Sequence, residues 1–289
     1  MGQSEGMRIN KFLSAAGICS RREADRLIAA GKVTVAGKQA ELGTLVSAGM
    51  EVKVNGRRVG VVEELAAKKK VLLVVNKPVG VVCTTTDNDR AQNIVELIDY
   101  PERVYPIGRL DKDSEGLLLL TNQGELVNQI LRCENGHEKE YIVRVDKALT
   151  ASFLEKLRRG VHLESLQVTT LPCKVEARDK TSFSITLTQG LNRQIRRMCE
   201  ACGYHVIGLK RIRIMNIRLQ NLHSGAFRNV TAAEQKTLLL LLTEKPRSLQ
   251  GKSAKTVRTE ERRKKNYAAR QKAYFQRRER EGGTWKRET

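Results

Sequence analysis

The stretch GRLDKDSEGLLLLT, residues 108–121, sets acidic residues directly before an uninterrupted apolar run. The run of leucines is bounded by polar residues, so residues 117–121 are expected to form a buried strand. The same stretch places the carboxylate of Asp111 close to Arg109. In a chain with a formal net charge of +21, a single acid at this position is poorly suited to binding a polyanion. Asp111 is therefore a candidate chemical reagent.

The residues around this stretch predict a mixed fold. Residues 71–75 read as a second buried strand, which stops at Asn76-Lys77-Pro78 because proline cannot donate to a central ladder. We interpret Lys77 as part of a surface turn at the domain entrance and not as a reactive lysine. Strands and helices do not alternate regularly, so an α+β fold is favoured over a doubly wound sheet. Further strands are expected at 141–145 and 183–187, and helices at 126–131, 150–159 and 192–202. One catalytic domain should span residues 70–245.

A smaller α/β module precedes this domain and is expected to span residues 7–65, with its core ending near residue 56. Ser20 and Glu23 have the spacing of a capping box, which predicts a helix over residues 21–30 followed by a glycine stop. Alternating valines predict short strands at 33–35 and 52–54, and the Asn-Gly pair that follows is a hairpin signal.

Two segments have the composition of chain outside a packed domain. Residues 57–70, rich in Arg, Glu, Lys and Ala, look like a linker. Residues 246–289 combine few apolar groups with many charges. Such a segment cannot bury enough surface to offset the entropy of ordering, so a disordered basic tail is expected.

Composition narrows the class of partner. The chain has 53 Lys and Arg residues against 32 acids, which favours a polyanion and above all a nucleic acid. No apolar run approaches the roughly 18 residues of a membrane span, so no membrane partner is expected. The six cysteines are scattered and lack the spacing of a disulfide scaffold, which indicates a reducing, cytoplasmic compartment.

The acidic stretch has two simpler interpretations. Its pattern D-x-D-x-x-G opens a calcium-binding loop, but that loop needs a bidentate glutamate at its twelfth position, where Asn122 stands. The calcium interpretation is excluded on this ground. An ordinary turn or cap role for Asp111 or Asp113 is the other alternative.

A cysteine pair invites a metal or redox interpretation. Cys199 and Cys202 lie close to His205, but no second pair accompanies them and both fall on an apolar stripe. They are expected to pack in the core. The four histidines form no recognisable triad or ligand set.

Three segments of the first module, RINKFL (8–13), GICSR (17–21) and LIAAGKV (27–33), resemble the S4-type RNA-binding domain. In that family a basic helix face rests against structured RNA, and such contacts position RNA without reading its sequence. Without the resemblance, a solvated basic helix would be the simpler interpretation. The resemblance implies phosphate contacts from Arg8, Lys11, Arg21, Arg22 and Arg26.

Short motifs follow in order along the second domain: NKPVG (76–80), GRLD (108–111) with GLLLLTN (116–122), HEKEY (137–141), GLNRQIRRM (190–198) and LKR (209–211). Together they resemble the RNA pseudouridine synthases, in the branch that modifies single ribosomal RNA sites and carries an S4 domain in front. The wording of the fourth motif is most similar to the F subfamily of the large-subunit enzymes. The resemblance implies a mixed, mainly antiparallel sheet and isomerisation of a uridine of 23S rRNA near the peptidyl-transferase region, with no cofactor and no metal.

The resemblance also implies roles for single residues. Asp111 matches the family's aspartate, which acts as a nucleophile or as a base in a glycal-type route. Tyr141 matches the tyrosine that stacks on a flipped uracil, and Leu209 matches an aliphatic wall for the same ring. Arg109 matches the side chain that fills the space left in the RNA stack. The other expected contacts are Ile195 in the pocket and, for RNA, Lys112, Asn192, Arg193, Gln194 and Arg197.

Arg196 is the predicted cation partner of Asp111. Burial alone would favour the neutral acid, so a reactive carboxylate in a pocket that excludes water needs a fixed positive charge. On a helix capped by Asn192, Arg196 lies at the border of the apolar stripe that contains Ile195 and Met198. The family pattern selects the same arginine. Arg197 is expected on the solvated face.

Ribosomal RNA is the expected partner, with 23S rRNA first and a tRNA loop as a further possibility, and a monomer is the default. One other function class stays open. The charge and the first module, taken alone, would equally predict a noncatalytic S4-type RNA-binding or ribosome-assembly protein.

Removal of residues 246–289 should weaken general RNA affinity and reduce its dependence on salt, because the tail supplies basic groups for phosphate contacts. Turnover should remain measurable. Binding of the full-length and truncated chains is to be compared across a salt series, with pseudouridine formation assayed in parallel. A truncated chain without turnover would contradict this expectation.

Overall fold

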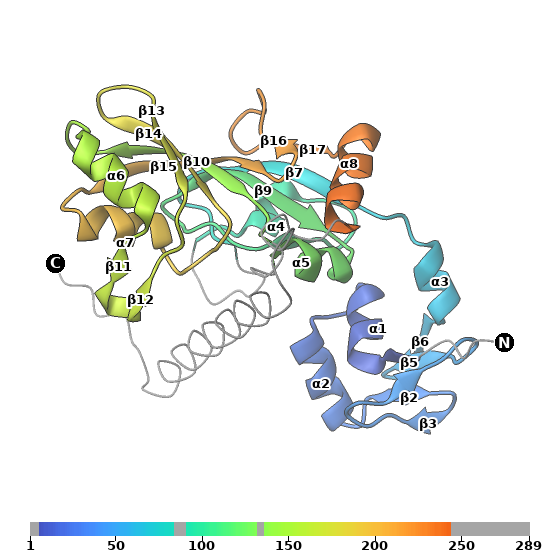
Figure 1. Cartoon of the computed structure of the whole chain (residues 1–289). Helices are drawn as coiled ribbons and strands as arrows, with labels where there is room; N and C mark the ends of the chain where they lie inside the picture. Colours follow the sequence, from blue (N-terminus) through green and yellow to red (C-terminus); the bar gives the residue numbers. More distant parts are fainter. Residues whose placement is uncertain (1–5, 84–90, 132–135, 244–289) are drawn as a thin grey trace.

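The computed structural model describes residues 6–83, 91–131 and 136–243 (Figure 1). A small N-terminal domain precedes a larger domain built on a nine-stranded sheet. The predicted tail at residues 246–289 lies outside the described residues. Within the described parts of the chain, no helix is long and apolar enough to cross a membrane.

The N-terminal domain packs two helices, α1 (Ile9–Ala15) and α2 (Arg21–Ala29), against short strands. As predicted, Ser20 caps α2, since its Oγ accepts the N–H of Glu23 at 3.2 Å. The carboxylate of Glu23 pairs with Arg26. The strands are β1 (Met7–Arg8) paired with β4 (Leu45–Val46), and an antiparallel sheet in the order β3 (Lys38–Gln39), β2 (Val33–Val35), β5 (Val52–Val54), β6 (Arg57–Gly60).

The predicted linker over residues 57–70 is wrong for most of its length. Its first residues form β6, which pairs with β5, and α3 (Val62–Ala67) follows. Arg58 and Glu64 pair across this segment at 2.6 Å, while Val59, Val62 and Leu65 pack against the N-terminal core. The charged composition concealed these apolar positions, which attach the segment to the first domain.

The sheet of the second domain is mixed and mainly antiparallel, as expected. Its strand order is β13-β14-β10-β15-β9-β7-β17, with β16 paired to β15 and β8 paired to β9. One neighbouring pair, β15 with β9, is parallel. The strands are β7 (Leu72–Lys77), β8 (Tyr105–Ile107), β9 (Glu115–Thr121), β10 (Lys139–Val145), β13 (Lys174–Ala177), β14 (Ser182–Leu187), β15 (Val206–Ile214), β16 (Ile217–Arg218) and β17 (Phe227–Asn229). A separate hairpin joins β11 (His162–Leu163) to β12 (Val168–Thr169).

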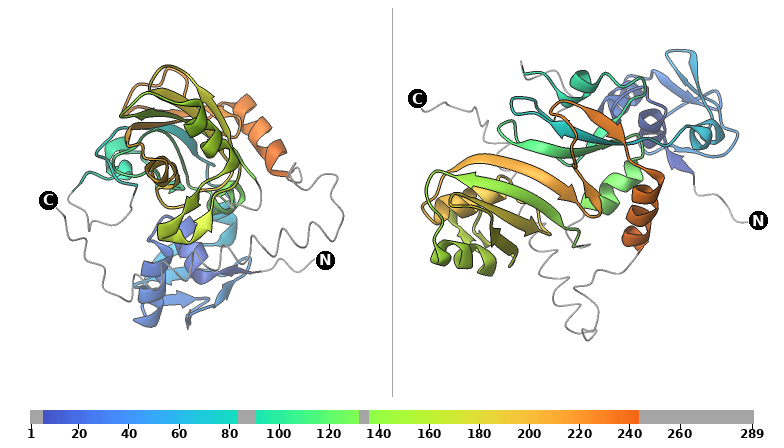
Figure 2. Two further views of the ribbon diagram at one scale, coloured as in Figure 1. Left: turned by 60° about the vertical axis from the view of Figure 1, so that its left-hand side comes forward. Right: turned by 90° about the horizontal axis from the view of Figure 1, so that it is seen from above.

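Helices cover the two halves of this sheet separately (Figures 1 and 2). One half, β10, β14 and β15, packs against α6 (Ala151–Arg159) and α7 (Gln194–Ala201). In the other half, β9 is buried on both faces. Leu117 and Leu119 pack with α5 (Gly124–Leu131) and α8 (Ala232–Thr243), and Leu118 and Leu120 pack with α4 (Ile94–Ile98). The leucine run is long because neither face of β9 meets water.

The two halves meet at a very close backbone contact. The parallel pairing of β15 with β9 consists of two residue pairs, Lys210 with Glu115 and Arg211 with Gly116. Gly116 has φ +104°, and a Cβ atom there would lie 2.3 Å from the carbonyl oxygen of Arg211. Only glycine allows both the left-handed backbone and this approach.

Gly116→Ala should therefore destabilise the second domain by about 4 kcal/mol or more, since it adds a backbone clash to the cost of the positive φ. Gly225→Ala is the matched control, because Gly225 has φ +81° and a Cβ atom there would meet nothing within 4 Å. That change should cost about 1–3 kcal/mol. Urea unfolding monitored in the second domain gives both values, and equal losses would contradict the close-contact argument.

Candidate active site

A cavity of about 450 Å³ opens where the two halves of the sheet meet. Its walls come from the loop before β9, the facing strands β10 and β15, and the segment that leads into α7. Motifs that are far apart in the sequence thus line one space. Of the predicted site residues, the cavity is lined by Arg109, Asp111, Tyr141, Asn192, Arg193, Gln194, Ile195 and Leu209.

The loop before β9 presents Asp111 to this cavity. Leu110 is buried among the side chains around α4, and its N–H lies 3.4 Å from the Sγ of Cys83. The N–H of Ser114 donates to the carbonyl of Asp111, which closes a turn. Because the residue before it is anchored in the core, the carboxylate of Asp111 is left at the cavity wall, with 35% of its side chain exposed.

Arg193 supplies the positive charge next to Asp111. Its Nη1 lies 3.6 Å from the Oδ2 of Asp111, and its guanidinium binds both oxygens of Asp113, at 3.2 and 2.9 Å. Arg193 has a left-handed backbone, φ +50°, directly before α7. The helix therefore begins at Gln194, and the prediction that Asn192 caps it is wrong.

Arg196 is buried. It was predicted to pair with Asp111, but its guanidinium instead contacts backbone carbonyls. Its Nη1 donates to the carbonyl of Val206 at 3.0 Å and its Nη2 to the carbonyl of Asp113 at 2.9 Å. The same Nη2 lies 3.4 Å from the Oδ2 of Asp113. Helical periodicity located Arg196 beside the core but did not reveal which loop oxygen lies above it.

The carboxylate of Asp113 joins these two arginines. Burial raises its pKa, but the hydrogen bonds from Arg193 and the charge of Arg196 outweigh burial, and the net pKa lies below its ordinary value. In turn, the hydrogen bonds to Asp113 raise the pKa of Arg193. At neutral pH the loop therefore carries an ionised Asp113 that orders two guanidinium groups beside Asp111.

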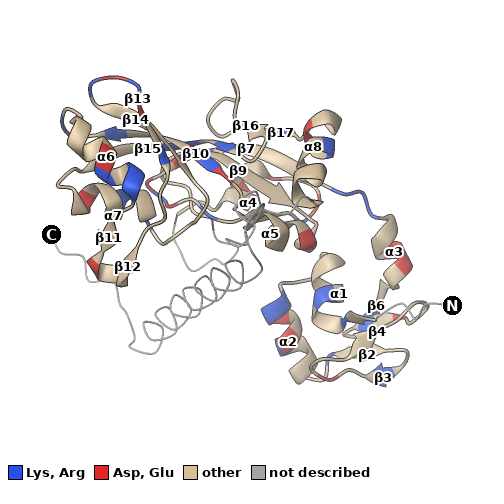
Figure 3. Ribbon diagram, viewed as in Figure 1, with Lys and Arg blue, Asp and Glu red and all other residues tan. Residues whose placement is uncertain are grey.

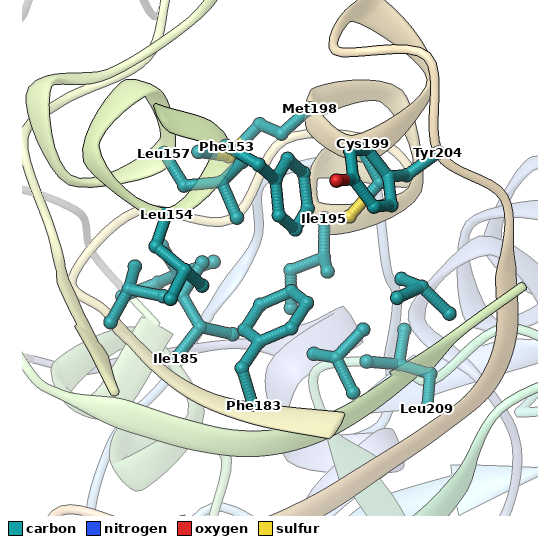
Figure 4. Packing of buried hydrophobic residues seen from close by; sticks show 14 of the residues in the cluster. Phe153, Leu154, Leu157, Phe183, Ile185, Ile195, Met198, Cys199, Tyr204 and Leu209 are labelled. Atoms are coloured by element: carbon teal, nitrogen blue, oxygen red, sulfur yellow. The ribbon is translucent and has the colours of Figure 1, made fainter. Parts of the chain in front are cut away.

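Side chains on the far wall are apolar or aromatic. Leu209 and Ile195 are buried in the cluster that joins α6 and α7 to the sheet (Figure 4). Tyr141, on β10, is half-buried and packs against the clusters on both sides of the junction. A carboxylate thus faces a surface on which a planar ring can rest.

Three residues predicted to contact RNA at this site differ in how far they are buried. Gln194 is buried, and its side chain bonds to the Leu191 N–H at 3.0 Å and to Gln189 at 3.2 Å, so it holds the cavity loop. Arg197 is half-buried and donates to the carbonyl of Asn192 and to Ser165, where a solvated face was expected. Lys112 is exposed.

Sequence reasoning missed two buried cations. Lys77 is fully buried at the end of β7, and its Nζ donates to the carbonyls of Pro78 and Val81, both at 2.7 Å. The surface-turn prediction is therefore wrong, and burial lowers the pKa of this ammonium despite nearby acids. Arg211 is 3% exposed and lines the cavity. Both residues lie inside the motifs quoted above, NKPVG and LKR, and this was the sequence signal that could have identified them.

The basic residues predicted on the first domain lie on α1, on α2 and directly before α1, and Figure 3 colours Lys and Arg blue. Arg8, Arg21, Arg22 and Arg26 are exposed. Lys11 is different, because its Nζ pairs with Glu125 of α5 at 2.9 Å and so joins the two domains.

The described residues contain no group of three or more His, Cys, Asp or Glu side chains placed to hold a metal ion. Cys199 is buried in the core, as expected, and burial raises the pKa of its thiol to about 12. Cys202 packs against the same cluster.

The sequence matches two family patterns, the S4 domain over residues 7–52 and RNA pseudouridylate synthase over residues 71–201. The dual-specificity RNA pseudouridine synthase RluF of Salmonella typhi is 51% identical over 81% of this chain and 79% of its own length. The ribosomal large subunit pseudouridine synthase B of Bacillus subtilis (strain 168) is 37% identical over 81% of this chain and 96% of its length.

A crystal structure of a pseudouridylate synthase superposes with a TM-score of 0.59 at 28% identity, over 80% of this chain and 99% of that chain. Both domains therefore match in the order in which they were predicted. By this order, and by the identity over four fifths of its length, the chain belongs to the family of RNA pseudouridine synthases that carry an N-terminal S4 domain.

Proposed function

We propose that the protein converts a uridine of 23S rRNA, near the peptidyl-transferase region, to pseudouridine and that Asp111 is the reactive group. The ribosomal substrate is supported by the B-type relative, whose name assigns it to the large ribosomal subunit. The dual specificity named for the RluF relatives supports a second RNA substrate, and we propose a tRNA loop for it. The observation that carries the proposal is a single ionisable carboxylate and an aromatic ring in one cavity, Asp111 and Tyr141.

The reaction is an isomerisation that needs no redox step. The N1–C1′ bond breaks with its electron pair remaining on the base, the base turns, and C5 bonds to C1′. The proton lost from C5 is balanced by one gained at N1. Asp111 acts either by bonding to C1′, a bond that breaks again when C5 attacks C1′, or by removing the C2′ proton, which returns to C2′ when C5 bonds to C1′. Both routes need an ionised carboxylate, and the guanidinium of Arg193 lies 3.6 Å from it.

A uridine inside folded RNA must be flipped out to reach Asp111, at a cost of a few kcal/mol. Stacking on Tyr141 and contact with Leu209 and Ile195 offset part of this cost, because all three line the cavity. Arg109, at the cavity wall, is placed to fill the space left in the RNA stack.

The RNA outside the pocket is proposed to rest on the basic face of the first domain. Arg8, Arg21, Arg22 and Arg26 are exposed there and provide phosphate contacts. Lys11 joins them only if RNA replaces Glu125 as its partner. Lys112 and Asn192 extend this contact at the cavity rim. The monomeric state and the cytoplasmic location expected from the sequence stay predictions.

Asp111→Asn should abolish pseudouridine formation, lowering the single-turnover rate by at least about 1,000-fold, because the amide can neither attack C1′ nor accept the C2′ proton. RNA affinity should change little. Asp99→Asn, an exposed acid in the same domain and outside the cavity, is the matched control and should keep the wild-type rate.

Pseudouridine mapping in ribosomal RNA from cells with and without the protein identifies the target uridine. A wild-type chain that binds RNA and forms no pseudouridine would leave the noncatalytic RNA-binding function in place of this proposal.

Arg193→Ala and Asp113→Asn should each lower the single-turnover rate by about tenfold, or ~1.4 kcal/mol, since each removes the fixed cation beside Asp111 or the acid that holds it. The double variant should be no slower than the slower single variant, because the residues act as one unit. Effects that multiply would contradict this. Arg196→Ala should instead lower the unfolding temperature, because it removes two backbone hydrogen bonds from a buried group.

A further inference from the structure

Arg211 is a buried cation with unused hydrogen-bonding capacity. A guanidinium carries five N–H donors. In the described part of the chain, Arg211 makes one side-chain hydrogen bond, from its Nε to the carbonyl of Leu117 at 2.7 Å, and its Nη2 is buried without a partner. No described acid lies within ion-pair distance of it. A buried charge that lacks partners costs several kcal/mol, so its presence calls for a ligand.

Three other arginines near the site are already occupied by protein groups. Arg193 binds Asp113, and Arg196 binds two carbonyl oxygens. Arg213, two residues further along β15, pairs with Glu138 at 3.0 Å and Glu140 at 2.7 Å. Among these residues Arg211 is distinguished by combining burial, a place in the cavity wall and free donors.

The position of Arg211 is set by the sheet. It pairs directly with Tyr141 across β10 and β15, so both side chains leave the sheet on the same side. Leu209 precedes it by two residues and shares that face. The backbone of Arg211 is pressed against Gly116, which restricts movement of the strand. A ring resting on Tyr141 and Leu209 would therefore have its edge next to this guanidinium.

We propose that Arg211 donates a hydrogen bond to a carbonyl oxygen of the flipped uracil and stabilises the negative charge that the base acquires when N1–C1′ breaks. This rests on the proposed function. The electron pair left on N1 spreads to O2 and O4, so a fixed donor at either oxygen is stronger in the transition state than in bound uridine. A backbone phosphate is a poorer match, because Arg211 lies beside the ring-binding side chains and is 3% exposed.

The test uses the full chain and a stem-loop that contains the uridine modified by the wild-type enzyme. Arg211→Lys and Arg211→Met should lower the single-turnover rate by about 100-fold or more, with lysine the less severe, while RNA affinity stays within about twofold. Stem-loops with 2-thiouridine or 4-thiouridine at the target weaken one acceptor oxygen at a time. One of these should slow the wild-type enzyme and have little further effect on the Arg211 variants.

Arg213→Lys is the matched control, on the same strand, outside the cavity lining and held by two acids. It should leave the response to both thio-substituted RNAs as in the wild type. A wild-type rate in Arg211→Lys, or thio effects that multiply fully with the Arg211 changes, would overturn the inference.

Unfolding temperatures show whether each variant is folded; if Arg211→Met is not, the lysine variant and the thio-substituted RNAs decide. Absence of pseudouridine from the wild-type chain would instead refute the proposed function.

Discussion

The site depends on the parallel contact between β9 and β15, where the backbone of Arg211 meets a glycine with no side chain. This contact joins two antiparallel half-sheets that each have their own helices and their own core. The loop that carries Asp111 enters β9 on one side of the contact, and Tyr141 and Leu209 stand on the other. The cavity lies at this junction, so an acid from one half faces apolar and aromatic side chains from the other. A bulkier residue at position 116 would push β9 away from β15 and so separate Asp111 from the cavity wall formed by Tyr141 and Leu209.

Charge around the cavity is arranged so that one carboxylate remains available. Asp113 holds Arg193 through two hydrogen bonds and lies near Arg196, while Asp111 is paired more loosely, at 3.6 Å. A carboxylate saturated with hydrogen bonds is a poor nucleophile and base, since its lone pairs are already engaged. Because Asp113 takes the hydrogen bonds of Arg193, the carboxylate of Asp111 stays accessible at the cavity wall, and Arg211 adds a positive charge with free donors on the opposite wall.

Local patterns predicted most of the elements that form the two domains. Alternation and apolar runs located β7, β9, β10 and β14, and capping chemistry located α2. The predictions were wrong where a contact with a distant part of the chain outweighed the local sequence pattern. The charged segment after residue 56 joins the first domain through three apolar side chains, and α7 begins after a left-handed Arg193 that no propensity would indicate. Lys77 was assigned to a surface turn beside Pro78, but it is buried and donates to two carbonyls.

Local sequence patterns were enough to show which segments are buried, that the chain carries a charge suited to RNA, and that Asp111 follows an anchoring leucine ahead of a buried strand. These properties depend on residues close together in the chain, so spacing reports them. The pairing of cations with acids could be seen only in the folded chain. Asp111 and Arg193 lie far apart in the sequence, and their pairing follows from the position of α7 against the loop. Periodicity gives the face on which a side chain lies and not its distant partner. The pairing of Asp111 with Arg193 therefore depends on how the two half-sheets pack together. The same packing leaves Arg211 buried with free donors.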